Sequence, residues 1–205
     1  SDAFKVMFNG DAYVSSSLYL GDTKITSTAD ELNLLSGVTS LASGILSSVT
    51  ENDKTGVRLS TSDVDNHGDI GANAVDLSRS IAASTTRGAT GSQSTAMGDG
   101  TTASGYASTA MGYTTTASAS QSTAIGNNTT ASGFSSTAMG LATTASDYGS
   151  LVIGQYNLLG STVTNSAISY NTDNTAFVIG NGANAGSPSD AFKVMFNGDA
   201  YVSSS

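Results

Sequence analysis

The chain has 205 residues, a formal net charge of −9 and only 11% charged residues. The acidic excess argues against nucleic acid and anionic membrane surfaces as partners. There is no cysteine, which excludes a disulfide framework, and no apolar run approaches the roughly 20 residues of a membrane-spanning helix. We therefore expect no membrane contact by this segment, and expect any anchor or export signal to lie outside it.

The two ends of the chain carry the same sequence, because residues 1–17 are identical to residues 189–205 at an offset of 188. Repetition of this length favours a tandem array of near-identical units over the duplication of a single element. Each copy alternates apolar and polar residues around an Asn-Gly pair, the strongest short signal of a β-hairpin. We predict a hairpin and strand segment over 1–27, ending a preceding unit, and a repeated hairpin over 183–205. The predicted turn residues are Asn9, Gly10, Asn197 and Gly198.

Residues 28–50 predict a short helix, because four apolar residues follow the 4-3-4 spacing of a coiled coil. Gly37 and Gly44 each weaken such a helix by about 1 kcal/mol, so it would need partner chains. We interpret the segment as a helical neck. Residues 29–38 also resemble a connector that is common in phage tail fibres. The expected contact residues of the neck are Leu34, Val38, Leu41 and Ile45.

Residues 51–84 are interpreted as a polar connector. The stretch 63–69 is rich in side-chain oxygens, but His67 and Ala74 stand where a calcium-binding EF-hand loop places an oxygen ligand and a glutamate. A solvated turn is the better interpretation. His67 is the single histidine of the chain, so one chain cannot form a histidine cluster or a catalytic triad. We expect no catalytic residue, no cofactor and no metal site.

Residues 85–182 contain the strongest signal, a motif that recurs every fourteen residues. The copies are Ser94–Gly98, Ser108–Gly112, Ser122–Gly126, Ser136–Gly140 and a looser Ser150–Gly154. Fourteen residues fit two short strands and two tight turns, which make one coil of a β-solenoid. Thr95 and Met97 share one face of a strand and Ala96 takes the other, but the sequence leaves open which face is internal. So thin a coil buries little apolar surface, which favours the association of several chains.

These motifs, with the Thr-Thr-Ala-Ser phrases between them, resemble the head repeats of YadA-type trimeric autotransporter adhesins over residues 89–154. The resemblance implies an all-β homotrimer, in which a left-handed parallel β-roll is joined to the short coiled-coil helix and the hairpins. This chain has Thr-Ala-Met where the family more often has Val-Ala-Ile. The predicted structural core of the repeats consists of Ala96, Met97, Ala110, Met111, Ala124, Ile125, Ala138, Met139, Val152 and Ile153.

The favoured function is a structural and adhesive unit of an extracellular or cell-surface fibre, built from tandem trimeric units without catalysis. Its expected partners are further copies of itself and a host-surface or carbohydrate ligand. A phage tail fibre or tailspike segment, located on the virion tail, is the first alternative. The second is an ice-binding β-solenoid, suggested by threonine pairs that begin at Thr101, Thr115, Thr129 and Thr143.

Overall fold

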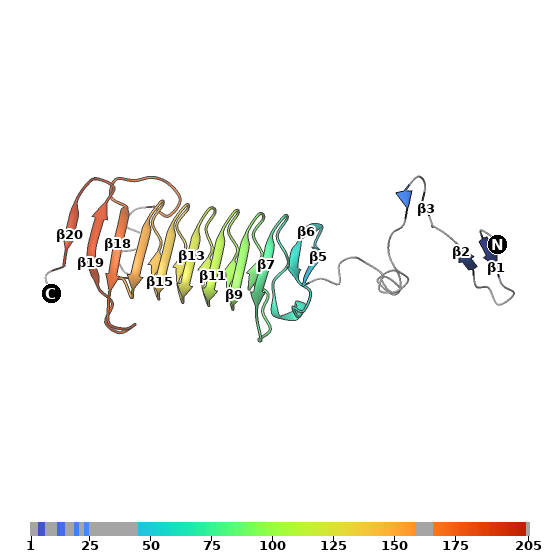
Figure 1. The fold of residues 1–205 in the computed structure, drawn as a ribbon. Helices are drawn as coiled ribbons and strands as arrows, with labels where there is room; N and C mark the ends of the chain where they lie inside the picture. Colours follow the sequence, from blue (N-terminus) through green and yellow to red (C-terminus); the bar gives the residue numbers. More distant parts are fainter. Residues whose placement is uncertain are drawn as a thin grey trace. The chain divides into compact units, whose positions relative to one another are not determined.

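Figure 1 shows the computed structural model, which describes residues 45–158 and 166–203 and, nearer the N-terminus, four short strands. The chain divides into two units, residues 1–41 and 42–205. The second unit contains all the fourteen-residue motifs.

In the first unit the four described strands form two antiparallel pairs. The strands are β1 (Phe4–Val6), β2 (Ala12–Val14), β3 (Tyr19–Leu20) and β4 (Thr23–Lys24). β1 pairs with β2, placing Phe4 opposite Val14 and Lys5 opposite Tyr13. β3 pairs with β4 in the same antiparallel sense.

The second unit contains two sheets wound from one chain. The long sheet has eleven strands in the order β20-β19-β18-β17-β15-β13-β11-β9-β7-β6-β5, and the short sheet has five in the order β16-β14-β12-β10-β8. The long-sheet strands are β5 (Leu46–Glu51), β6 (Lys54–Leu59), β7 (Val75–Arg79), β9 (Thr95–Asp99), β11 (Thr109–Tyr113), β13 (Thr123–Asn127), β15 (Thr137–Leu141), β17 (Leu151–Gln155), β18 (Thr175–Asn181), β19 (Asp190–Met195) and β20 (Ala200–Val202). The short-sheet strands are β8 (Gly88–Ala89), β10 (Thr102–Ala103), β12 (Thr116–Ala117), β14 (Thr130–Ala131) and β16 (Thr144–Ala145).

Neighbouring coils align at the fourteen-residue offset of the motif. In the long sheet Ala96 pairs with Ala110 and Ala110 with Ala124, while in the short sheet Ala103 pairs with Ala117. All of these strand pairs are parallel, and Figure 1 shows the long strands side by side. One copy of the motif therefore builds one coil, and the all-β solenoid predicted from the sequence is confirmed.

The solenoid begins before residue 85, within the segment 51–84 that we interpreted as a connector. β6 pairs in parallel with β7, with Arg58 opposite Asp76, and β7 pairs in parallel with β9, with Asp76 opposite Ala96. These register pairs are 18 and 20 residues apart instead of 14. Wider coils with charged residues at the position of the alanines conceal the repeat from a reading of the sequence.

The helix expected over 28–50 is wrong for residues 45–50, which are the part of this range that the structure describes. Leu34, Val38 and Leu41 lie outside the described residues. Ile45 lies at a bend and is 78% exposed, and the strand β5 begins at the next residue.

Strand β5 forms an antiparallel hairpin with β6. The turn between them contains Asn52 and Asp53, whose φ angles of 48° and 60° are those that a two-residue type I′ hairpin turn requires. Val49 and Thr50 are β-branched and favour extended backbone. Pairing with β6 therefore makes residues 46–50 of the expected helix a strand.

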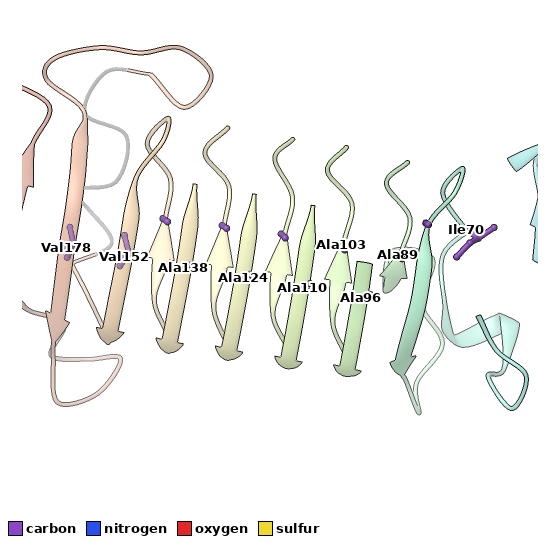
Figure 2. Packing of buried hydrophobic residues seen from close by; sticks show 13 residues of the cluster. Ile70, Ala89, Ala96, Ala103, Ala110, Ala124, Ala138, Val152 and Val178 are labelled. Atoms are coloured by element: carbon purple, nitrogen blue, oxygen red, sulfur yellow. The ribbon is translucent and has the colours of Figure 1, made fainter. Parts of the chain in front are cut away.

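The interior of the solenoid is a narrow column of small side chains (Figure 2). Figure 2 shows the alanines in line along the sheets, with Ile70 at one end of the column and Val152 and Val178 at the other. Alanine fills the middle because the two sheets of one coil leave no room for a longer side chain. The full cluster is Ile70, Ala74, Ala89, Ala96, Ala103, Ala110, Ala117, Ala124, Ala131, Ala138, Ala145, Val152 and Val178.

The direction of strand pairing changes at the C-terminal end. β18 is parallel to β17 but antiparallel to β19, and β19 is antiparallel to β20. β19 and β20 flank Asn197 and Gly198, and the φ of Gly198 is +93°. This hairpin covers the edge that β18 would otherwise expose.

Candidate functional site

The two faces of each long strand carry different residues. Ala96 is fully buried, whereas Met97 is 37% exposed on the opposite face. The residues predicted as one repeat core therefore divide between two faces. The interior holds Ala96, Ala110, Ala124, Ala138 and Val152, and the outer face holds Met97, Met111, Ile125, Met139 and Ile153.

The outer residues form a continuous apolar line, here named the methionine row, of Met97, Met111, Ile125, Met139, Ile153 and Ile179. Each pairs in register with the next, so the spacing is the strand separation of about 4.8 Å. A second row runs beside it through Thr95, Thr109, Thr123, Thr137, Leu151 and Phe177. Neither row contains a charged residue. Together they make a neutral strip along the outside of the coils.

In each of these strands the residue after the methionine-row position is glycine, so the glycines form a parallel row across the strands. Gly112 has φ +123°, and a Cβ placed there would lie 2.0 Å from the carbonyl oxygen of Gly126 in the next coil. Gly98 has the same relationship to Gly112. A residue with a side chain would meet both an unfavourable φ and a backbone clash, so only glycine allows the coils to stack this closely.

The threonines proposed as an ice-binding face point inward. Their Oγ1 atoms have no hydrogen-bond partner within the described part of the chain. Only the next threonine of each pair, such as Thr102, is partly exposed. The ice-binding interpretation is wrong for the first threonines, because a buried side chain cannot contact ice. These residues, Thr101, Thr115, Thr129 and Thr143, are each 0% exposed.

A buried serine precedes the long strand of each fourteen-residue motif, and these serines were not among the predicted core residues. Ser94 Oγ donates to the carbonyl oxygen of Gly91 at 2.7 Å, and Ser108 Oγ donates to that of Gly105 at 2.8 Å. Both serines are 1% exposed. The recurrence of serine at the first position of every motif is the signal that could have identified them.

Charged residues close the N-terminal end of the column. Arg58 is 2% exposed and Asp76 is 0% exposed, and the Nε of Arg58 lies 3.4 Å from the Oδ2 of Asp76. Arg58 also donates to Glu51 Oε1 at 2.9 Å and to the carbonyl oxygen of Gly68 at 2.8 Å. The opposite charges offset the cost of removing each ion from water.

The acidic stretch 63–69 forms a capped turn. The 3-10 helix η1 (Val64–Asn66) starts after Asp63, whose carboxylate accepts the N–H of Asp65 at 3.1 Å. His67 Nδ1 lies 2.9 Å from the carbonyl oxygen of Asp63. Over residues 45–158 and 166–203, no group of three or more His, Cys, Asp or Glu side chains is placed to hold a metal ion.

At the C-terminal end, asparagine side chains replace the strand that a further coil would supply. Asn157 Oδ1 accepts the N–H of Thr144 at 2.8 Å, and its Nδ2 donates to the carbonyl oxygen of Thr144 at 3.0 Å. Asn174 makes the same pair of bonds to Ser166, at 3.0 and 2.7 Å. The amide groups thereby satisfy backbone groups at the last edge of the short sheet and beside it.

The comparison with protein families gives a match to the YadA head domain repeat (2 copies), over residues 89–113, 103–129 and 131–157. These stretches cover about a third of the chain. No curated protein and no solved structure gives a match. Among the residues that the structure describes, no helix is long and apolar enough to cross a membrane. The matched stretches include most of the methionine row and most of the buried alanines, so the segment 89–157 that is similar to the YadA head domain repeat is folded as stacked parallel coils of a β-solenoid.

Proposed function

We propose that the chain is a structural and adhesive unit of an extracellular fibre in which three copies lie side by side. The methionine row carries this proposal, because it is an apolar line on the outside of a protein whose interior is too narrow to take it up. Met97, Met111 and Met139 are 36–40% exposed in the single chain. Contact between chains along this strip would remove these side chains from water.

The regular register of the row suits parallel association. Each coil presents equivalent residues at the same height, so the row of one chain meets identical rows when the solenoids lie parallel and aligned. The strip has no charges, so close approach brings no like-charge repulsion. The match to the YadA head repeat supports three chains rather than two, because adhesins of that family are trimers.

Tandem units would give the fibre its length. Residues 1–17 repeat as 189–205, which supports units of 188 residues placed one after another. In such an array, each seventeen-residue block closes the solenoid that precedes it. The outward surfaces of stacked coils then recur along the fibre and offer an extended surface for a host-surface or carbohydrate ligand.

Sedimentation equilibrium on the chain and two variants tests the trimer. We expect a mass of three times 20.4 kDa for the parent chain. Met111→Glu places a charge in the strip and should lower the mass toward that of one chain, while the β-rich circular dichroism spectrum is retained. Ser118→Glu is the matched control, because Ser118 is exposed outside the two rows, and it should keep the parent mass. A folded monomeric parent, or a Met111→Glu variant with the parent mass, would contradict the proposal.

A further inference from the structure

The edge of β18, the last parallel strand of the long sheet, is covered by the hairpin β19–β20, which makes specific contacts. Phe192 in β19 meets Phe177 in β18 with ring centroids 6.1 Å apart in an edge-on arrangement. Phe196 donates its N–H to the carbonyl oxygen of Asn174 at 3.0 Å, and its ring lies 5.4 Å from that of Tyr170. The hairpin is thus a fitted cap for β18.

All residues that the cap contributes lie in the block 189–205. Besides the two phenylalanines, Ser189 accepts the N–H of Asn181 at 2.9 Å through its carbonyl oxygen. Asp190 accepts the N–H of Leu158 at 2.9 Å. The sequence of this whole block occurs a second time, as residues 1–17.

The second copy also folds in the same register. In the C-terminal hairpin Phe192 lies opposite Val202 and Val194 opposite Ala200. In the N-terminal hairpin the residues at the 188-residue offset pair in the same way, Phe4 with Val14 and Val6 with Ala12. Two hairpins with one sequence and one register can make the same contacts with β18.

We propose that the β18 edge is a strand-exchange site, at which residues 1–17 of a second copy of this chain replace residues 189–205. Phe4 and Phe8 of the incoming copy would take the places of Phe192 and Phe196. The exchanged and unexchanged caps bury the same residues, as in domain swapping. The inference requires only the repeated sequence and the cap, so it does not depend on the adhesive function.

Tethering decides which copy occupies the site. The chain's own cap is linked to β18 through residues 182–188, so its effective concentration is far above that of another chain. The intact chain is therefore expected to cap itself in most molecules. Weakening residues 189–205 shifts occupancy to the second copy, and each exchange joins the N-terminal segment of one chain to the solenoid end of another. Repeated exchange gives head-to-tail multimers.

Disulfide trapping between two full-length chains tests the exchange, because the native chain has no cysteine. The acceptor chain carries Ile179→Cys, at the position opposite Phe192, together with Val194→Pro. Proline at Val194 weakens the chain's own cap, since β19 is hydrogen-bonded on both sides. The donor chain carries Phe4→Cys and a tag that separates it by mass.

We expect a reducible disulfide between donor and acceptor after mild oxidation. A donor with Lys5→Cys is the matched control, because successive residues of any β-strand point to opposite faces, and it should give at least tenfold less product. Adding Val6→Pro to the Phe4→Cys donor should abolish the product. One chain carrying Ile179→Cys and Phe192→Cys serves as the positive control for this register.

The same mixture is run with the native Val194, so that the result does not depend on the folding of the proline variant. A lower yield with the same preference for Phe4→Cys over Lys5→Cys supports exchange. Equal yields from the two donors with both acceptors, or no product from either while the positive control oxidises, would overturn the proposal.

Discussion

Arg58 and Asp76 are register partners in adjacent strands, and both side chains are buried where the following coils have alanine. The Nε of Arg58 lies 3.4 Å from the Oδ2 of Asp76. Arg58 has a second carboxylate partner in Glu51. Within the described residues, Asp76 has only Arg58 as a cationic partner. The pair is therefore asymmetric, and its two members should respond differently to substitution.

Arg58→Leu should lower the free energy of unfolding by about 3–5 kcal/mol, because it leaves Asp76 as an uncompensated buried charge. Asp76→Ala should cost about 1–3 kcal/mol, mainly for the N–H and hydroxyl of Ser78, which both donate to Asp76; Arg58 keeps Glu51, and alanine is the residue of the later coils. Urea denaturation followed by circular dichroism measures both. An Asp76→Ala variant at least as unstable as Arg58→Leu would show that the asymmetry is absent.

The buried threonine hydroxyls predict a stabilising substitution. Thr115 Oγ1 is buried and has no hydrogen-bond partner among the described residues. Thr115→Val has nearly the same shape and should raise the free energy of unfolding by about 1 kcal/mol, because it removes an unsatisfied polar group from the interior.

Ser108→Ala is the control for this prediction, since the Ser108 hydroxyl donates to the carbonyl oxygen of Gly105 at 2.8 Å. That variant should lose about 1 kcal/mol in the same denaturation experiment. Equal destabilisation by Thr115→Val and Ser108→Ala would mean that the threonine hydroxyl is satisfied in solution.

The coils can be predicted from the sequence because each position of a coil restricts the type of residue that fits there. Gly98 and Gly112 must be glycine for stacking, and the small side chain of Ala96 fits the column, so the motif returns at every turn. Which face of each strand points into the solenoid could not be predicted. Thr95 and Met97 are as compatible with a core as Ala96, and only the distance between the two sheets selects alanine.

The ends of the solenoid could not be predicted from the sequence for a different reason. Asp76 and Arg58 occupy the internal position of the first coils, and the polar residues conceal the periodicity. At the other end the side chain of Asn157 makes the hydrogen bonds that a further strand would make to Thr144. A single side chain leaves no periodic pattern in the sequence. The helix expected over 28–50 also fails where that range reaches β5, because apolar spacing alone does not reveal the hairpin partner β6.

The cap contains a carboxyl group that links its stability to pH. Burial raises the pKa of Asp190 above its ordinary value, opposed by the hydrogen bond from Leu158 and the nearby charge of Lys193. A raised folded-state pKa means that the native state binds the proton more tightly than the unfolded chain does. The stabilisation is complete below the unfolded pKa and is lost as pH rises through the raised folded pKa.

Asp190→Asn should therefore flatten this acidic part of the stability profile and make the protein more stable than the parent at neutral pH. The amide oxygen of asparagine can still accept the N–H of Leu158. Urea midpoints measured between acidic and neutral pH give the profile. Asp199→Asn removes a carboxyl group from an exposed position of the same hairpin and serves as the control. Parallel curves for Asp190→Asn and the parent would contradict this linkage.

Gly112→Ala tests the close stacking of the coils. The added Cβ would lie 2.0 Å from the carbonyl oxygen of Gly126, and the φ of +123° is unfavourable for alanine. We expect about 1–2 kcal/mol for the backbone conformation and about 1–3 kcal/mol more for the forced separation of the coils. Hydrogen exchange should accelerate at the amides between β11 and β13.

Gly198→Ala separates the two contributions. Gly198 has φ +93°, but a Cβ there meets nothing within 4 Å. This variant should therefore show only the conformational cost, about 1–2 kcal/mol, with normal exchange in the coils. If both variants lost the same free energy of unfolding, the glycine row would be required by backbone conformation alone. A larger loss in Gly112→Ala, with exchange accelerated at β11 and β13, would show that the coils stack too closely for any side chain at this row.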